Sequence, residues 1–128
     1  MHTHLGVYSL PRVDENQDGN EMTDPVRPQV RALDSFNFDD PALKVGLAGG
    51  VTTIVPRPGN ANVIGGTSTA VKLKLSAPER VMLREVCDLK MAIEGNPVGV
   101  YGKKEQAPAM LMSVITWRAR HSSRPRNT

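Results

Sequence analysis

The chain has 128 residues, of which 39% are hydrophobic and 4% aromatic, and these values limit it to one domain, or part of one, with a modest core. A single cysteine, Cys87, excludes an internal disulfide and a cysteine-based metal cluster. No run approaches the roughly 18 apolar residues of a membrane span, and the N-terminus lacks the apolar segment of a signal peptide. We therefore expect a soluble, cytoplasmic chain that has no membrane partner.

The formal net charge of +3 is unevenly distributed. Residues 1–40 hold eight acids and three bases, whereas residues 103–128 hold six bases and one acid. The final stretch, 118–128, is basic, polar and without periodicity, which is typical of a disordered tail. Such a tail can dock an acidic partner, but no aromatic residue follows Trp117 to stack on bases, which argues against nucleic acid.

The N-terminus carries two histidines, His2 and His4, two positions apart. On an extended segment, side chains at this spacing point to the same side, so both imidazoles can reach one metal ion. Taken alone, the pair is better explained by two surface histidines at a frayed terminus. The spacing therefore nominates a metal site without establishing it.

Residues 7–39 are acidic and rich in Pro, Asp and Asn, a mixture that predicts a long ordered loop. Asp18, Glu21 and Asp24 fall close together within it, as the ligands of a hard cation do. Their spacing lacks the later glutamate of an EF-hand loop, and we interpret them as solvated turn residues.

Asp40 before Pro41 predicts a helix start, because the Asp side chain caps free amides and Pro loses no hydrogen bond there. Gly49 or Gly50 is expected to end this helix, and the β-branched run 51–55 predicts a short buried strand. The apolar face of the helix is expected to contain Ala42, Val45, Leu47 and Ala48.

The loop 58–66 follows this strand and combines small residues with turn-forming ones. In α/β proteins the C-terminal ends of strands are where ligands bind, so the loop is a candidate binding element. Asn60 and Asn62 are its candidate substrate-binding residues, with stabilisation of their own turn as the alternative role.

The rest of the chain predicts two strands, two helices and their connections. Residues 70–75 alternate apolar and basic side chains, as a strand with one solvated face does, and 88–93 predicts a second strand. The other expected segments are a short helix over 78–86, a turn over 94–97, an irregular stretch over 98–106 and a helix opened by Ala107-Pro108 that buries Leu111, Val114, Ile115 and Trp117.

Several short segments occur in a fixed order: Met1-His2-Thr3-His4-Leu5-Gly6, the run 18–26, Arg31-Ala32-Leu33-Asp34, Gly50-Val51-Thr52-Thr53, the run 58–66, Asn96-Pro97 and Val100-Tyr101-Gly102. In this order they make residues 1–117 resemble the N-terminal part of a metal-dependent hydrolase of the amidohydrolase superfamily. The resemblance points to the branch around imidazolonepropionase-related and Xaa-Pro dipeptidase-like proteins.

This resemblance implies an α/β fold made of the first few units of a (β/α)₈ barrel, with His2 and His4 as ligands of a divalent metal, usually zinc. Such an ion lowers the pKa of bound water and polarises the scissile carbonyl of an amide or cyclic amide. Further ligands and a general-base Asp come from later strands in the family, so no catalytic residue is expected within this chain. The full-length form is expected to act on a small molecule and to form a homo-oligomer.

The sequence also departs from the family pattern. A complete barrel takes about 250 residues, only Met1 precedes His2, and the pattern stops after Trp117. We therefore hypothesise a truncated reading frame whose product is incomplete and inactive by itself. Two other interpretations stay open, namely a small non-catalytic binding protein that uses residues 118–128 and a barrel completed by a second polypeptide.

Overall fold

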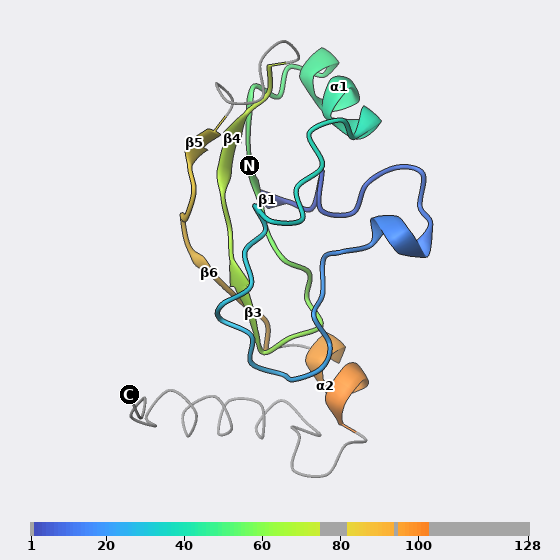
Figure 1. Ribbon diagram of the computed structural model, residues 1–128, viewed down its shortest axis with the longest axis vertical. Helices are drawn as coiled ribbons and strands as arrows, with labels where there is room; N and C mark the ends of the chain where they lie inside the picture. The colour runs from blue at the N-terminus through green and yellow to red at the C-terminus, as the bar shows by residue number, and fades with distance from the viewer. Residues whose placement is uncertain (1, 75–81, 94, 103–128) are drawn as a thin grey trace.

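The computed structural model describes residues 2–74, 82–93 and 95–102. Figure 1 shows its two α-helices at opposite ends of the long axis, with the strands between them. The elements in these ranges are β1 (His2–Thr3), the 3-10 helix η1 (Asp14–Asn16), α1 (Pro41–Ala48), β2 (Thr53–Pro56), β3 (Ile64–Thr67), β4 (Ala70–Lys72), β5 (Met82–Arg84), β6 (Leu89–Met91) and α2 (Gly95–Tyr101).

The strands form two sheets. The four-stranded sheet has the order β1-β2-β4-β5, and β3 pairs with β6 in a second, two-stranded sheet. β1 and β2 run parallel, whereas the β2–β4, β4–β5 and β3–β6 pairs are antiparallel. The fold is therefore mixed α/β, as expected, and the described residues show one parallel pair connected through α1. That this pair begins a (β/α)₈ barrel stays a prediction.

Helix α1 begins and ends where the sequence predicts. The Asp40 side chain accepts a hydrogen bond from the Ala42 backbone N–H, and Gly50, at φ +85°, follows the last turn. The expected apolar face is partly wrong, because Leu43 is the buried residue of this helix and Val45 is 72% exposed. Leu43 packs into the main core with Leu47 at its edge, a spacing of four residues that one helical face provides.

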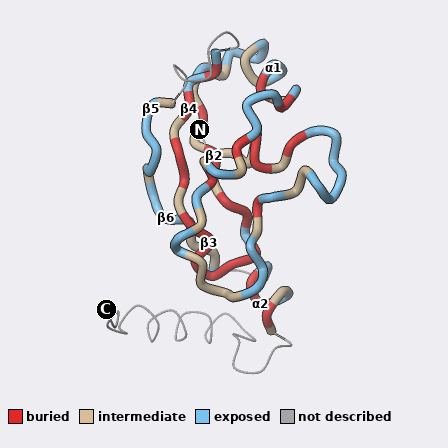
Figure 2. Tube along the Cα trace, in the orientation of Figure 1, coloured by how far each residue is buried: buried red, intermediate tan, exposed pale blue. Residues whose placement is uncertain are grey.

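The main core lies between the long N-terminal loop, α1 and the four-stranded sheet. Figure 2 shows buried segments along β4 and the loops beside it, while β5 is largely exposed. The buried members of this core are Val7, Ala32, Phe36, Leu43, Ile54, Val71 and Leu73. A smaller cluster around Val63 and Ile64 joins the two-stranded sheet to Val98 of α2.

Three predicted strands are present, each shifted or shortened: 51–55 is β2 at Thr53–Pro56, 70–75 contains β4, and 88–93 contains β6. The helix expected over 78–86 is wrong where it can be compared, because residues 82–84 form β5. β5 pairs with β4, and this pairing satisfies backbone groups that a helix would have bonded internally. Residues 78–81 lie outside the described ranges.

The turn expected over 94–97 and the irregular stretch expected over 98–106 are corrected by α2 between residues 95 and 101. Residues 94 and 103–106 lie outside the described ranges. Pro97 lies in the first turn of this helix, where its missing N–H costs no hydrogen bond. Pro97 and Tyr101, four residues apart, are both buried on one side of the helix. In the sequence, the four-residue spacing of Pro97 and Tyr101 favours a helix, whereas the Gly95-Asn96 pair favours a turn.

The last predicted helix, from Ala107-Pro108, and the basic stretch 118–128 also lie outside the described residues. Docking of an acidic partner by that stretch therefore stays a prediction. Within the ranges described, no helix is long and apolar enough to cross a membrane.

Candidate functional site

The parallel pairing of β1 and β2 brings two chain segments to one edge of the sheet. His2 pairs with Val55 and Thr3 with Pro56, so His4 and Arg57 each follow directly from the paired ends. The Arg57 backbone N–H donates to the Thr3 carbonyl at 3.1 Å, which extends the pairing by one residue. His4 therefore lies at the C-terminal edge of these strands, as expected for a binding edge.

The His4 ring is oriented by the backbone of the neighbouring strand. Its Nδ1 lies 2.9 Å from the Arg57 carbonyl oxygen. Because a carbonyl oxygen only accepts hydrogen bonds, the proton of the neutral ring resides on Nδ1, and Nε2 carries the lone pair. This is the tautomer in which an imidazole ligates a metal through Nε2.

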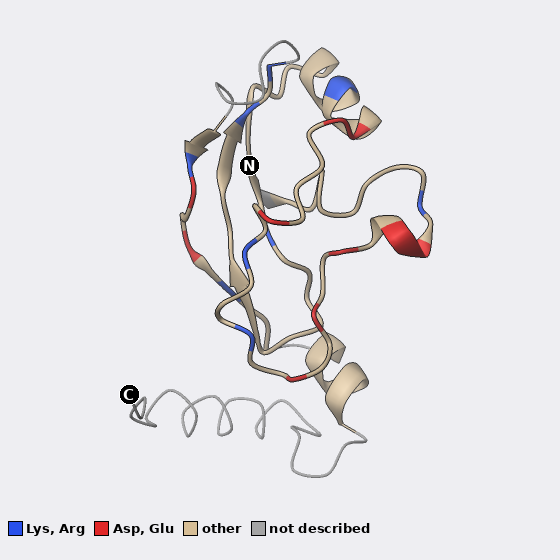
Figure 3. Cartoon of the chain, viewed as in Figure 1, with Lys and Arg blue, Asp and Glu red and all other residues tan. Residues whose placement is uncertain are grey.

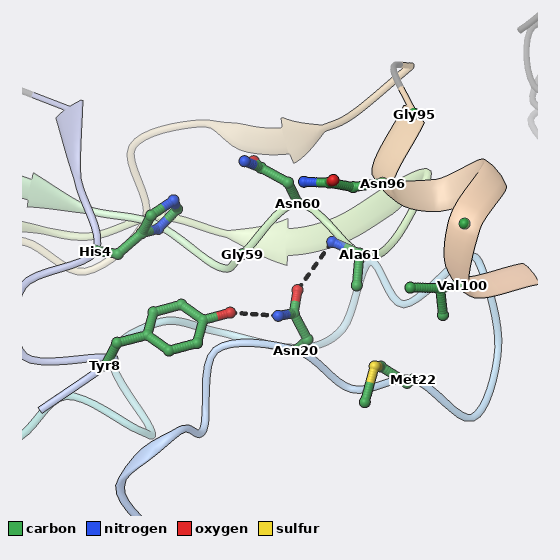
Figure 4. Close-up of a pocket in the computed structure, with 11 residues that line it drawn as sticks. His4, Tyr8, Asn20, Met22, Gly59, Asn60, Ala61, Gly95, Asn96 and Val100 are labelled. Carbon is green, nitrogen blue, oxygen red and sulfur yellow. Dashed lines mark hydrogen bonds between the residues drawn. The ribbon is translucent and has the colours of Figure 1, made fainter. Parts of the chain in front are cut away.

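A cavity of about 500 Å³ opens beside this histidine. Figure 4 shows His4 and Tyr8 on one side of it and the side chains of Asn60 and Asn96, close to each other, on the other. Its lining comes from the N-terminal loop, the loop after β2 and helix α2: His4, Tyr8, Asn20, Met22, Gly59, Asn60, Ala61, Gly95, Asn96, Gly99 and Val100.

Asn20 holds one wall of this cavity together. Its Nδ2 donates to the Tyr8 hydroxyl, and its Oδ1 accepts from the Ala61 backbone N–H at 3.0 Å (Figure 4). The Tyr8 ring meets the His4 ring edge to face, with centroids 5.6 Å apart. Burial raises the pKa of the Tyr8 hydroxyl above its ordinary value of 10.0, so this wall stays uncharged at neutral pH.

The two candidate asparagines occupy different environments. Asn60 is exposed, lines the cavity and accepts a hydrogen bond on Oδ1 from Lys90 Nζ. Asn62 is 2% exposed, and its Nδ2 donates to the backbone carbonyls of Glu21 and Asp24 at 2.5 and 2.9 Å. Asn62 Nδ2 also lies 3.0 Å from the hydroxyl of the buried Tyr101. Its contacts anchor the acidic loop, and it is not among the cavity-lining residues; the substrate-binding role of both asparagines stays a prediction.

The acidic residues of the N-terminal loop serve local turns, as interpreted from the sequence. A Glu21 carboxylate oxygen accepts from the Thr23 backbone N–H at 2.9 Å, and Asp24 Oδ1 accepts from that of Val26 at 2.7 Å. The Thr23 hydrogen bonds hold the pKa of Glu21 below its ordinary value. In the ranges described, no three His, Cys, Asp or Glu side chains gather where they could hold a metal ion. The metal role of His2 and His4 therefore stays a prediction.

Sequence reasoning missed three residues of this site. Tyr8 and Asn20 sit in a loop whose composition predicted only turns, and Asn96 sits in a segment expected to be a turn. Asn20 and Asn96 both fall inside segments that carried the family resemblance. That membership was the signal that could have nominated them.

Comparisons with known proteins find two similar amidohydrolases. No family model matches the sequence. A solved crystal structure of an amidohydrolase from Thermotoga maritima MSB8 is 39% identical, with a TM-score of 0.86 over 94% of this chain and 32% of that one. Amidohydrolase tasK from Hapsidospora irregularis is 33% identical over 123 residues, which cover 88% of this chain and 12% of that protein. The chain is therefore similar to a part of these amidohydrolases, and it spans only a small share of their length.

Proposed function

We propose that this chain contributes the His-x-His edge of a metal-dependent hydrolase that cleaves the carbon–nitrogen bond of an amide or cyclic amide. In this proposal β1 and β2 are the first strands of a (β/α)₈ barrel, with α1 between them. The observation that carries it is the His4 Nδ1 to Arg57 carbonyl hydrogen bond at the rim of the cavity. The likeness to amidohydrolases supports the reaction class.

The residues present fit a zinc-like ion. A backbone carbonyl on Nδ1 directs Nε2 of His4 toward ligation, and His2 lies two residues earlier on the strand that leads into His4. When bound, such an ion polarises a carbonyl and lowers the pKa of a bound water. A tetrahedral site needs two ligands beyond these histidines, which the proposal assigns to polypeptide outside this chain.

The chain's own residues supply the walls around a bound amide. Asn60 and Asn96 each present an amide group, with one acceptor oxygen and two N–H donors, to the cavity. The Tyr8–Asn20 pair gives the opposite wall a fixed, uncharged surface. These groups can orient a substrate carbonyl and N–H, while the ion and a base from elsewhere carry the bond cleavage.

Zinc titration of the 128-residue chain tests the proposal, with a chromophoric zinc indicator as competitor. We expect weak binding, since two imidazoles fill half of a tetrahedral site, and about a tenfold loss in His4→Ala and in His2→Ala. His121→Ala is the matched control, because it removes the remaining histidine, which belongs to no predicted site, and it should bind as the unmodified chain does.

Two results would contradict the proposal. The first is zinc affinity in His4→Ala equal to that of the His121→Ala control, with both variants folded by circular dichroism. The second is stoichiometric zinc that the purified chain keeps through extended dialysis at neutral pH. That result would contradict the expectation that the two histidines fill only half of a metal site.

A further inference from the structure

The Tyr8 ring packs against the His4 imidazole because a tight turn brings the two residues together. The Tyr8 backbone N–H donates to the His4 carbonyl oxygen at 3.0 Å, and Gly6, at φ +78°, lies inside this turn. The two rings are close to perpendicular, at 79°, with centroids 5.6 Å apart. This is the edge-to-face arrangement that aromatic rings favour.

The backbone of His4 does not by itself fix the orientation of the imidazole. The torsion about the Cβ–Cγ bond of a histidine is broad and roughly two-fold, so neighbouring groups decide which nitrogen faces which side. The Arg57 carbonyl oxygen accepts from Nδ1 at 2.9 Å, which selects one of the two flipped orientations. The Tyr8 ring, perpendicular to the imidazole, restricts the plane in which the imidazole can lie. The carbonyl and the aromatic ring together limit where Nε2 points.

The cavity around His4 offers packing to orient the imidazole, and no formal charge. In many metal sites a carboxylate holds the second nitrogen of a ligating histidine. Among the described residues that line the His4 cavity, none is Lys, Arg, Asp or Glu. Figure 3 shows helix α2, which contributes one wall of this cavity, without charged side chains, whereas η1 is acidic. The aromatic contact with Tyr8 therefore gains importance.

Tyr8 is itself held in place at its hydroxyl end. Asn20 donates to this hydroxyl through Nδ2, and its Oδ1 accepts from the Ala61 backbone N–H at 3.0 Å (Figure 4). The Gly59 backbone N–H donates to the Gly19 carbonyl at 2.7 Å, which joins the two loops beside the same hydroxyl. A ring that is fixed at its far end can hold its neighbour in one orientation.

Two glycines make room for this ring. A Cβ at Gly19 would overlap the Tyr8 ring and hydroxyl, and a Cβ at Gly59 would overlap the Tyr8 hydroxyl and the Asn20 side chain. Neither glycine has a positive φ, so the backbone conformation does not require glycine at these positions. The space that Tyr8 and Asn20 occupy is therefore what excludes a larger side chain.

We propose that Tyr8 is a positioning residue for the candidate metal edge. Its ring holds the His4 imidazole in the orientation, and hence the tautomer, in which Nε2 is the ligating nitrogen. Gly19 and Gly59 are glycines because this ring must fit beside them. The metal ion that Nε2 would bind rests on the proposed function, whereas the effect of Tyr8 on the His4 tautomer is measured without metal.

Imidazole NMR of the full chain, in buffer stripped of metal by a chelating resin, tests this role. Long-range ¹H–¹⁵N spectra at a pH of about 8.5, where an ordinary imidazole is neutral, show which ring nitrogen carries the proton. His4→Ala assigns the signals. We expect His4 to be protonated on Nδ1 in the unmodified chain and in Tyr8→Phe, which keeps the ring. Tyr8→Leu should show a mixture of the two tautomers, because the surroundings of the imidazole set its tautomer.

Zinc titration of the same variants measures the consequence for ligation. The apparent affinity falls with the fraction of the protein in the competent state, so we expect about a threefold loss or more in Tyr8→Leu. Tyr8→Phe should change the affinity by less than about twofold.

Phe38→Leu is the matched control for the loss of a ring. Phe38 is exposed, lies outside the lining of the His4 cavity and forms a perpendicular pair with Phe36. The variant therefore removes the same kind of ring contact at another place in the N-terminal loop. It should change neither the His4 tautomer nor the zinc affinity.

Gly19→Ala displaces the ring without changing its chemistry, and it decides the question if Tyr8→Leu does not fold. It should give the same mixture of His4 tautomers, because the added methyl group takes the place of the Tyr8 ring. It should also lower the midpoint of urea denaturation, but not in a Tyr8→Leu background. Leucine lacks Cζ, Cε2 and the hydroxyl, the Tyr8 atoms that the methyl group would meet.

A single Nδ1–H tautomer in folded Tyr8→Leu or folded Gly19→Ala would overturn the positioning role. A His4 ring protonated on Nε2 in the unmodified chain would overturn it without any variant. A Tyr8→Phe variant that behaves as Tyr8→Leu does would overturn the role of the ring.

Failure of the proposed function gives a different pattern of results. An effect of Tyr8→Leu on the tautomer, with equal zinc affinity in His4→Ala and His121→Ala, would reject the metal role and leave the positioning of His4 standing. Loss of zinc affinity in His4→Ala, with an unchanged tautomer in Tyr8→Leu, would reject the positioning role alone.

Discussion

Asp40 and Gly6 are joined by a hydrogen bond across 34 residues of sequence, with the Gly6 backbone nitrogen 2.9 Å from Asp40 Oδ2. The other oxygen, Oδ1, accepts from the backbone N–H groups of Leu10 and Ala42 at 3.3 and 3.0 Å. One carboxylate, 1% exposed, therefore caps α1 and holds the turn that follows His4. The helix start and the candidate metal edge depend on the same side chain.

Replacement of Asp40 by Ala should destabilise the fold strongly. It removes a helix cap and leaves two further backbone donors without their acceptor, so we expect the free energy of unfolding to fall by about 2–4 kcal/mol. Urea denaturation followed by circular dichroism measures this change. Asp39→Ala is the matched control at an exposed neighbouring position and should change stability by less than about 0.5 kcal/mol. Equal stability of the two variants would show that the Asp40 contacts do not hold the loop.

The two asparagines of the loop after β2 should respond differently to the same substitution. Asn62→Ala removes the donors that satisfy the Glu21 and Asp24 carbonyls, and we expect it to lower the free energy of unfolding by about 2–3 kcal/mol. Asn60→Ala, at an exposed site, should change it by less than about 0.5 kcal/mol. Denaturation of both variants under one condition checks the contrast. A large loss in Asn60→Ala would contradict the division of roles.

Gly66 is required by its backbone conformation and by its surroundings. Its φ is +107°, and a Cβ at this position would collide with the Val30 carbonyl, which also accepts from the Thr67 backbone N–H. We expect Gly66→Ala to lower the free energy of unfolding by about 2 kcal/mol or more. Gly95→Ala, which meets no atom within 4 Å, should be neutral or raise it by up to about 1 kcal/mol. Thermal melts of the pair measure both effects, and a neutral Gly66→Ala would exclude the close approach of Val30.

The free energy of unfolding should fall at alkaline pH because of two hydroxyls, that of the buried Tyr101 and that of the half-buried Tyr8. Burial raises the pKa of Tyr101 above 10.0, with a smaller contribution from Asp24, and burial also raises that of Tyr8. The folded state therefore holds these protons more tightly than the unfolded chain does. Their contribution is complete below pH of about 10 and is lost as the pH rises through the folded-state pKa.

Tyr101→Phe isolates one of these contributions. We expect the variant to be less stable by about 1 kcal/mol at neutral pH, because the hydroxyl contacts to Asn62 and Asp24 are gone. Its stability should then decline less steeply above pH of about 10 than that of the unmodified chain. Urea denaturation at a series of pH values compares the slopes. Parallel curves over the alkaline range would show that Tyr101 does not titrate differently in the two states.

Local sequence patterns were sufficient to predict the structure where a few adjacent residues determine their own backbone conformation. Asp40-Pro41 and the Gly49-Gly50 pair define α1, because caps and positive φ are properties of a few adjacent residues. The turns at Glu21 and Asp24 follow for the same reason. The ordered series of short segments pointed to amidohydrolases, and the likeness to solved and curated amidohydrolases confirms that resemblance.

Only the tertiary structure decided which neighbours each segment acquired. Residues 82–84 became a strand because β4 offered an unpaired edge, and Asn62 became an internal anchor because the acidic loop folded over it. The positions of Lys90 beside Asn60 and of His4 beside Arg57 join residues 30 and 53 positions apart. Local sequence carries no signal for such contacts, since their energy comes from packing and desolvation that exist only once the chain has folded.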